Sequence, residues 1–145
     1  MAKILSEQVG QEFYARWGPS VFTYCRLYLG NRDQAEIATE EAFLRFLSQS
    51  PDLGGDRLSL ALVRCACEAA GRRCVPPFSG SVEVEELTDA LPLLPCEERS
   101  VFILRSVLGL RAEVVAVAML RTPQQVNQIW IESLLRIRKL WLKRG

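Results

Sequence analysis

Apolar residues recur every three to four positions through most of the chain, and this spacing predicts helices rather than strands. The first helical run covers residues 6–29, and its large residues lie one turn apart: Phe13, Trp17, Val21 and Cys25. Within this run Gly18-Pro19 is expected to bend or restart the helix, because proline lacks the N–H that a helix interior uses. Gly30-Asn31 predicts its end.

Two more helices are predicted in the first half of the chain. The second, about 33–47, starts at Asp33-Gln34-Ala35-Glu36, which resembles a capping box. Its expected inner face consists of Ala35, Ala38, Ala42 and Phe46. A loop rich in Pro, Gly and Ser separates it from a third helix over 57–73.

The stretch from Cys74 to Val84, CVPPFSGSVEV, cannot sustain a helix or a central strand. We therefore predict an all-α fold of two small helical domains, 1–74 and 89–145, joined by a linker over 75–88.

The second domain contains the pattern of a helix-turn-helix. A short helix over about 112–119 is followed by two residues and then by Thr122-Pro123-Gln124-Gln125. Thr122 can cap the next helix, Pro123 suits its first position, and Gln125 can complete a capping box. Such a unit holds its second helix against a partner, most often the major groove of DNA.

The last helix carries more apolar residues than one inner face needs. The expected inner face is Val126, Trp130, Ser133, Ile137 and Leu140. Five apolar residues remain: Ile129, Ile131, Leu134, Leu135 and Leu142. Packing on the N-terminal domain, a protein interface with a second copy or an inhibitor, and an aggregation-prone surface are the three explanations.

Charge is divided unevenly behind a net charge of +1. Residues 96–145 carry nine basic and four acidic side chains, and no acid follows Glu132. This surplus is compatible with phosphate contacts and equally with a solvated helix end, where cations favour the helix dipole.

Several function classes are not expected. The sequence has no run long enough to span a bilayer, no signal peptide and no glycine-rich phosphate loop. It has no histidine, and Cys65 and Cys67 point to different sides of a helix, so a metal site is not expected. The pairs Glu40-Glu41 and Glu97-Glu98 do not converge, so we expect neither an enzyme nor a cofactor. The five cysteines are odd in number and predict reduced thiols in a cytoplasmic protein: Cys25, Cys65, Cys67, Cys74 and Cys96.

The order of these elements resembles the extracytoplasmic-function sigma factors of bacterial RNA polymerase. Matching positions in the first half are Ala35, Glu36, Glu41, Ala42 and Phe43. Those in the second half are Leu94-Pro95, Glu98-Arg99, Leu104-Arg105, Gly109-Leu110, Ala116 and Val126. The resemblance implies a helical region two, a linker and a helix-turn-helix region four, and a protein that directs core RNA polymerase to promoter DNA in transcription initiation.

The resemblance also assigns candidate site residues. The polymerase contact is expected on the second helix, at Glu36, Glu40, Glu41 and Phe43. DNA near the start site is expected to contact Arg57, Arg64, Arg72 and Arg73. The upstream element is expected to contact Arg121, Gln124, Asn127, Gln128 and Arg136. Ile129 and Leu134 are candidates for contact with an anti-sigma factor or a second copy.

Departures from the family pattern define an alternative function. Ile37 stands where the family has Asp, while Ala61 and Glu68 stand where it has the Trp and Asn used in promoter melting. Ile129 and Glu132 replace basic or small polar residues in the recognition helix. The alternative is a divergent sigma-like protein that no longer reads promoters and acts as a regulatory protein-interaction module.

Overall fold

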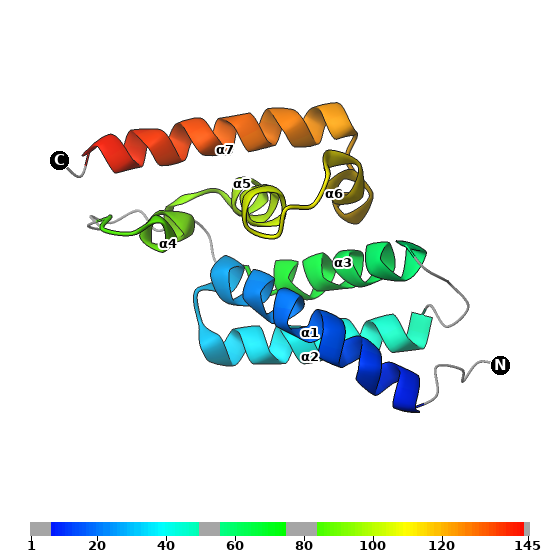
Figure 1. Ribbon diagram of the computed structural model, residues 1–145. Helices are drawn as coiled ribbons and strands as arrows, with labels where there is room; N and C mark the ends of the chain where they lie inside the picture. The colour runs from blue at the N-terminus through cyan, green and yellow to red at the C-terminus, as the bar shows by residue number, and fades with distance from the viewer. Residues whose placement is uncertain (1–6, 50–55, 75–83, 144–145) are drawn as a thin grey trace.

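The computed structural model describes residues 7–49, 56–74 and 84–143, and these residues form helices and turns without a strand, so the all-α prediction is confirmed (Figure 1). The first half consists of α1 (Glu7–Leu29), α2 (Arg32–Gln49) and α3 (Asp56–Gly71). The second half consists of α4 (Leu87–Ala90), the 3-10 turn η1 (Leu91–Leu93), α5 (Cys96–Phe102), the π-helical turn η2 (Ile103–Val107), α6 (Ala112–Met119) and α7 (Pro123–Lys143).

The two halves lie one above the other (Figure 1). Helices α1, α2 and α3 pack together as a bundle, and α7 packs against α5 and α6 on the other side of the molecule. Between them, α3 packs against α6 and α1 contacts α5. The buried apolar residues form one continuous cluster that extends from α1 to α7. The predicted division into two sigma-like domains remains a prediction.

Helix α1 runs through Gly18-Pro19 without restarting, so the predicted restart is wrong. Pro19 lies on the exposed side, whereas Gly18 is buried and a Cβ there would lie 3.2 Å from the Tyr14 ring. The buried residues before and after the proline, Gly18 and Val21, pack in the core, and this packing offsets the hydrogen bond that Pro19 cannot make. The helix ends as expected at Gly30, whose φ is +70° and whose N–H donates to the Arg26 carbonyl at 2.9 Å.

The cap of α2 lies two residues earlier than predicted. Asn31 Oδ1 accepts a hydrogen bond from the Gln34 N–H at 3.0 Å, and the helix begins at Arg32. Asp33 therefore lies inside the first turn and is not a cap. The predicted inner face is confirmed, because Ala35, Ala38, Ala42 and Phe46 are all buried.

The end of the predicted linker range overlaps a short helix. Residues 75–83 lie outside the described residues, and Leu87 already begins α4. Asp89 Oδ2 accepts hydrogen bonds from the Glu85 and Glu86 N–H groups at 3.0 and 2.9 Å, and these bonds lower the pKa of Asp89. The acidic segment thus caps a short helix.

Two of the five cysteines are not reduced thiols. Cys74 and Cys96 form a disulfide with a Cα–Cα distance of 6.7 Å, which corrects the expectation from cysteine counting. Counting fails here because the two residues are 22 positions apart and only the packing of α3 near α5 brings them together. Cys25, Cys65 and Cys67 are free thiols.

Within the described ranges, no helix is long and apolar enough to cross a membrane. The same ranges contain no group of three or more His, Cys, Asp or Glu side chains that could hold a metal ion.

Candidate functional site

The short helix, tight turn and capped long helix predicted from local sequence are present as α6, the turn after it and α7. Thr122 Oγ1 accepts a hydrogen bond from the Gln125 N–H at 3.1 Å, and Gln125 Oε1 accepts one from the Thr122 N–H at 2.9 Å. This reciprocal pair is the predicted capping box, and Pro123 is the first residue of α7. The start of α7 is therefore fixed by residues within three positions of one another.

The turn before the cap depends on one residue in a rare conformation. Leu120 has φ +58° and ψ +47°, the left-handed region in which glycine is usual, and its side chain is exposed. The Arg121 N–H donates to the Ala116 carbonyl at 2.9 Å, which closes the end of α6. This closed turn sets the angle between α6 and α7.

The inner face of α7 is the predicted one. Val126, Ser133 and Ile137 are buried, and Trp130 and Leu140 are partly buried. Trp130 also makes contacts that the sequence did not indicate. Its Nε1–H donates to Ser106 Oγ at 2.9 Å, and the Arg105 guanidinium lies 4.3 Å from its ring centroid. These contacts attach α7 to η2.

The outer face of α7 has two parts. The N-terminal part is polar, with Gln124, Asn127 and Gln128 exposed. The C-terminal part is apolar, with exposed Ile131, Leu134, Leu135, Trp141 and Leu142. Since four of the five leftover residues remain exposed, packing on the N-terminal half does not explain them. The fifth, Ile129, is partly buried against the core.

Two of the arginines predicted to contact upstream DNA are bound to acids of α5. Arg136 donates to both oxygens of Glu98, at 2.7 and 3.1 Å, and this interaction raises the pKa of Arg136. Glu98 is buried, so separating the pair would leave a buried carboxylate without its partner. Arg121 forms an ion pair with Glu97. Both arginines therefore hold α7 and its preceding turn on α5.

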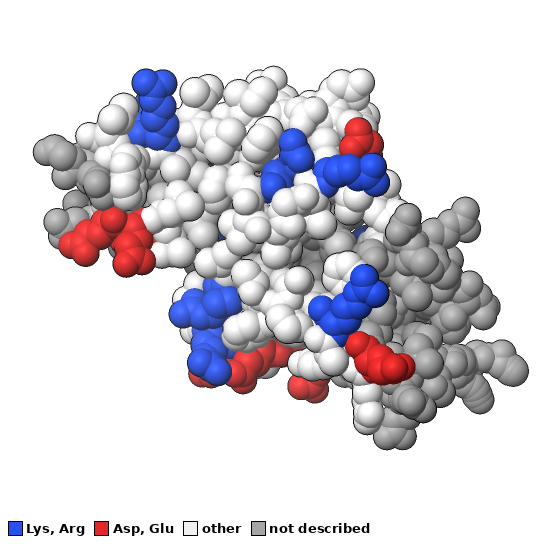
Figure 2. Space-filling model, viewed as in Figure 1, with Lys and Arg blue, Asp and Glu red and all other residues white. Residues whose placement is uncertain are grey.

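The charges that remain near α7 are few. Arg138 and Lys139 are exposed, and among the described residues no ion pair engages them. On the face shown in Figure 2, Lys and Arg form separate small groups, several of them beside Asp or Glu. This face has no continuous basic surface.

The described arginines expected at DNA near the start site differ in their contacts and exposure. Arg73 donates to Glu41 at 2.5 Å and to Gln34 Oε1 at 2.7 Å, so it ties the end of α3 to α2. Arg64 lies 3.6 Å from Glu68, while Arg72 is exposed. The Arg57 side chain lies outside the described residues.

Of the four residues expected to bind polymerase, two are engaged within the fold and two are exposed. Glu41 is engaged by Arg73, and Phe43 is buried with its ring 4.6 Å from that of Tyr14. Glu36 and Glu40 are exposed. They line an open hollow of about 630 Å³, whose wall also includes Tyr14, Phe22, Arg32, Thr39, Phe43, Leu44 and Leu47. Acidic and apolar side chains therefore meet in one groove of α1 and α2.

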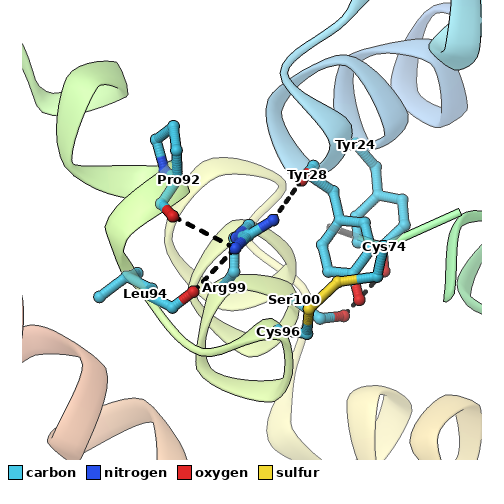
Figure 3. The surroundings of a disulfide bond; sticks show 8 residues. All are labelled: Tyr24, Tyr28, Cys74, Pro92, Leu94, Cys96, Arg99 and Ser100. Carbon is cyan, nitrogen blue, oxygen red and sulfur yellow. Dashed lines mark hydrogen bonds between the residues drawn. A yellow bond between two sulfur atoms is a disulfide. The ribbon is translucent and has the colours of Figure 1, made fainter. Parts of the chain in front are cut away.

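A buried arginine joins the two halves. The sequence had indicated it only as a position that matches the family pattern. Arg99 donates to the Tyr28 carbonyl of α1 at 3.0 Å and to the Leu94 carbonyl at 2.9 Å (Figure 3). Its guanidinium also lies 5.6 Å from the Tyr28 ring centroid, and burial lowers its pKa. Tyr24 and Ser100 share a hydrogen bond of 2.8 Å across the same joint.

Comparisons with known proteins add no family: no protein-family model matches the chain, and no curated protein matches it significantly.

Proposed function

We propose that the protein is a sigma-like transcription factor that binds core RNA polymerase through α2 and reads promoter DNA with the N-terminal part of α7. The observation that carries this proposal is a capped helix whose outer face, immediately after a tight turn, presents exposed Gln124, Asn127 and Gln128. Asn and Gln can each make two hydrogen bonds to an adenine edge in the major groove. An amide-rich face at a helix start is the arrangement that helix-turn-helix proteins use for reading bases.

DNA contact by this chain would depend more on base reading than on charge. Arg121 and Arg136 are engaged by Glu97 and Glu98, and Gln128 Nε2 donates to Glu132 at 3.1 Å. Among the described side chains of α7, exposed Arg138 and Lys139 are then the cations ready for phosphates. Since phosphate contacts supply most non-specific affinity, the chain needs polymerase to bring it to DNA.

The proposed polymerase contact is the groove of α1 and α2. Glu40 supplies negative charge there, Glu36 pairs with Arg32 at 3.2 Å, and Phe22, Leu44 and Leu47 supply apolar area. A partner helix with basic and apolar residues would suit this groove. Ile37, another exposed apolar residue of α2, is 43% exposed and does not line the groove.

The test is binding of core RNA polymerase by the wild-type chain and by a Glu36→Lys/Glu40→Lys variant. We expect the wild type to bind and the variant to bind at least about tenfold more weakly, because rim charges steer association and suppress mismatched partners. Glu113→Lys, at an exposed residue of α6, is the matched control and should bind as the wild type does. Absence of wild-type binding, or equal binding by the double variant, would contradict the proposed contact.

The apolar outer part of α7 supports a second candidate function, a regulatory interaction module. Ile131, Leu135 and Leu142 lie along one line of the helix opposite its buried face, and they are 48%, 58% and 66% exposed. A protein partner such as an anti-sigma factor or a second copy would cover this line. In this case a Leu135→Ser/Leu142→Ser variant loses a partner complex or a dimer, seen by analytical ultracentrifugation, while Gln124→Ala/Gln128→Ala retains it.

A further inference from the structure

The outer side of α7 carries a stripe of residues with the spacing of a coiled-coil seam. Residues 124, 128, 131, 135, 138 and 142 are separated alternately by four and three positions, and all six are exposed. A repeat of about 3.5 residues keeps one side of a helix facing a partner helix. The stripe lies on the side of α7 opposite buried Ser133 and Ile137, so packing within the chain does not account for its spacing.

The two ends of this stripe differ in chemistry. Its first two positions are glutamines, whereas its last four positions, which we call the α7 seam, are Ile131, Leu135, Arg138 and Leu142. The seam is therefore mainly apolar over about three helical turns. In Figure 1 α7 forms one edge of the molecule, and the elements that it contacts, among them α4, α5 and α6, lie on its inner side. The α7 seam is thus open to a second helix.

An acid and a base border the α7 seam on the same side. Glu132 follows seam position 131, and Lys139 follows seam position 138, so the two charges lie seven residues apart and both are exposed. Among the described residues, neither is in an ion pair. The cation one turn from Glu132, Arg136, donates to Glu98 instead. One border of the seam therefore offers a negative and a positive charge to a partner.

We propose that the α7 seam binds the α7 seam of a second copy of this chain, with the two helices antiparallel. Reversing the second helix places Ile131 beside Leu142 of the second copy and Leu135 beside Arg138 of the second copy. The pairing has twofold symmetry, so each of these contacts occurs twice. The long stem of Arg138 can cover Leu135 of the second copy while its guanidinium stays in water.

The borders of the seam match in this alignment as well. Glu132 lies beside Lys139 of the second copy on one border, and Leu134 lies beside Trp141 of the second copy on the other. Leu134 and Trp141 are 38% and 37% exposed. In a parallel pair Glu132 and Lys139 would instead face the opposite border, at Asn127 and Leu134. Border charges set partner choice and orientation in paired helices, and here they select an antiparallel copy of the same helix.

This dimer gives the regulatory interaction module its partner, and its effect on DNA rests on the proposed function. The contact is a single helix long and has a charged residue near its centre, so its area is at the small end for specific interfaces and its dissociation constant should be micromolar. Arg138 and Lys139, the cations ready for phosphates, lie within or beside the seam. Dimerisation and DNA binding therefore compete for the same part of α7.

The experiment is sedimentation equilibrium of the full chain across the micromolar range, at low salt where surface charges are least screened. The wild type should pass from monomer to dimer as its concentration rises. Glu132→Lys and Lys139→Glu should each dimerise at least about tenfold more weakly, because each substitution places like charges together at both symmetric contacts. Glu113→Lys, at an exposed residue of α6, is the matched control and should dimerise as the wild type does.

Mixing the two variants makes the outcome decisive. Glu132→Lys and Lys139→Glu together restore opposite charges at both contacts, so an equimolar mixture should associate as strongly as the wild type. A wild type that stays monomeric, single variants that dimerise as the wild type does, or a mixture no stronger than either variant alone would overturn the second copy as partner. These arms use neither polymerase nor DNA. Failure of the monomer to bind polymerase or DNA would instead contradict the proposed function and leave the dimer standing.

Discussion

At the residue scale, contacts between near neighbours were predictable and contacts between distant residues were not. Thr122 and Gln125 are three positions apart, and capping chemistry alone specified their reciprocal bonds. Glu98 and Arg136 are 38 positions apart, and nothing in the local sequence pairs them. The ion pairs of Arg121 and Arg136, two residues predicted to touch DNA, therefore could not be read from the local sequence.

Thiol reactivity gives a prediction at this scale. Burial raises the pKa of Cys25 to about 11 and that of Cys67 to about 12, from an ordinary value of 9.0. A rise of three pKa units lowers the thiolate fraction at pH 8 roughly a thousandfold, and the thiolate is the reactive form. In the native protein at pH 8, we expect iodoacetamide to leave Cys25 and Cys67 almost unmodified for hours, measured by peptide mass spectrometry. The same reaction in urea is the control. Native modification of Cys25 at the urea rate would contradict its buried position.

At the element scale, helical periodicity placed the inner faces correctly and left the outer faces undecided. The alanine face of α2 and the inner face of α7 follow from a spacing of three to four residues. The leftover apolar residues of α7 needed the structure, because their exposure depends on where the N-terminal half packs. Pro19 shows the reverse case, since tertiary packing keeps α1 continuous where local preference favoured a break.

At the element scale, the exposed positive charges of α7 predict how DNA affinity depends on salt. If only Arg138 and Lys139 contact phosphates, the log–log dependence of DNA affinity on salt should have a slope of roughly −1.8. Arg138→Ala/Lys139→Ala should remove most of that slope, measured by fluorescence anisotropy with a labelled duplex. Arg111→Ala, at an exposed residue just before α6, is the matched control. A slope that stays steep in the double variant would mean that Arg121 or Arg136 leaves its acid to reach DNA.

At the scale of the whole molecule, the sequence predicted the long helices but not how the halves meet. The disulfide, the buried Arg99 and the shared core all join residues from both sides of the predicted linker. Such long-range contacts carry no periodic signal. Cysteine counting in particular gave the wrong state for Cys74 and Cys96, because an odd number of cysteines does not exclude one pair.

Reduction should therefore change global stability. A disulfide that closes a loop of 22 residues constrains the unfolded chain by about 3 kcal/mol in the chain-entropy description. We expect urea unfolding followed by circular dichroism to give a free energy of unfolding lower by about that amount in dithiothreitol. Cys74→Ser/Cys96→Ser should show no dependence on the reductant. Equal stability of the wild type in both conditions would mean that the bond does not constrain the chain.

The central claim is that α7 reads DNA as part of a polymerase complex. The most direct measurement assembles core RNA polymerase with the chain, incubates the complex with a random DNA library and sequences the retained DNA. We predict a shared motif that the core enzyme alone does not select. Gln124→Ala/Gln128→Ala should weaken this preference by about 1–3 kcal/mol for each pair of hydrogen bonds to a base that the substitution removes. Retained DNA without a shared motif, or a motif unchanged by the double variant, would contradict the account.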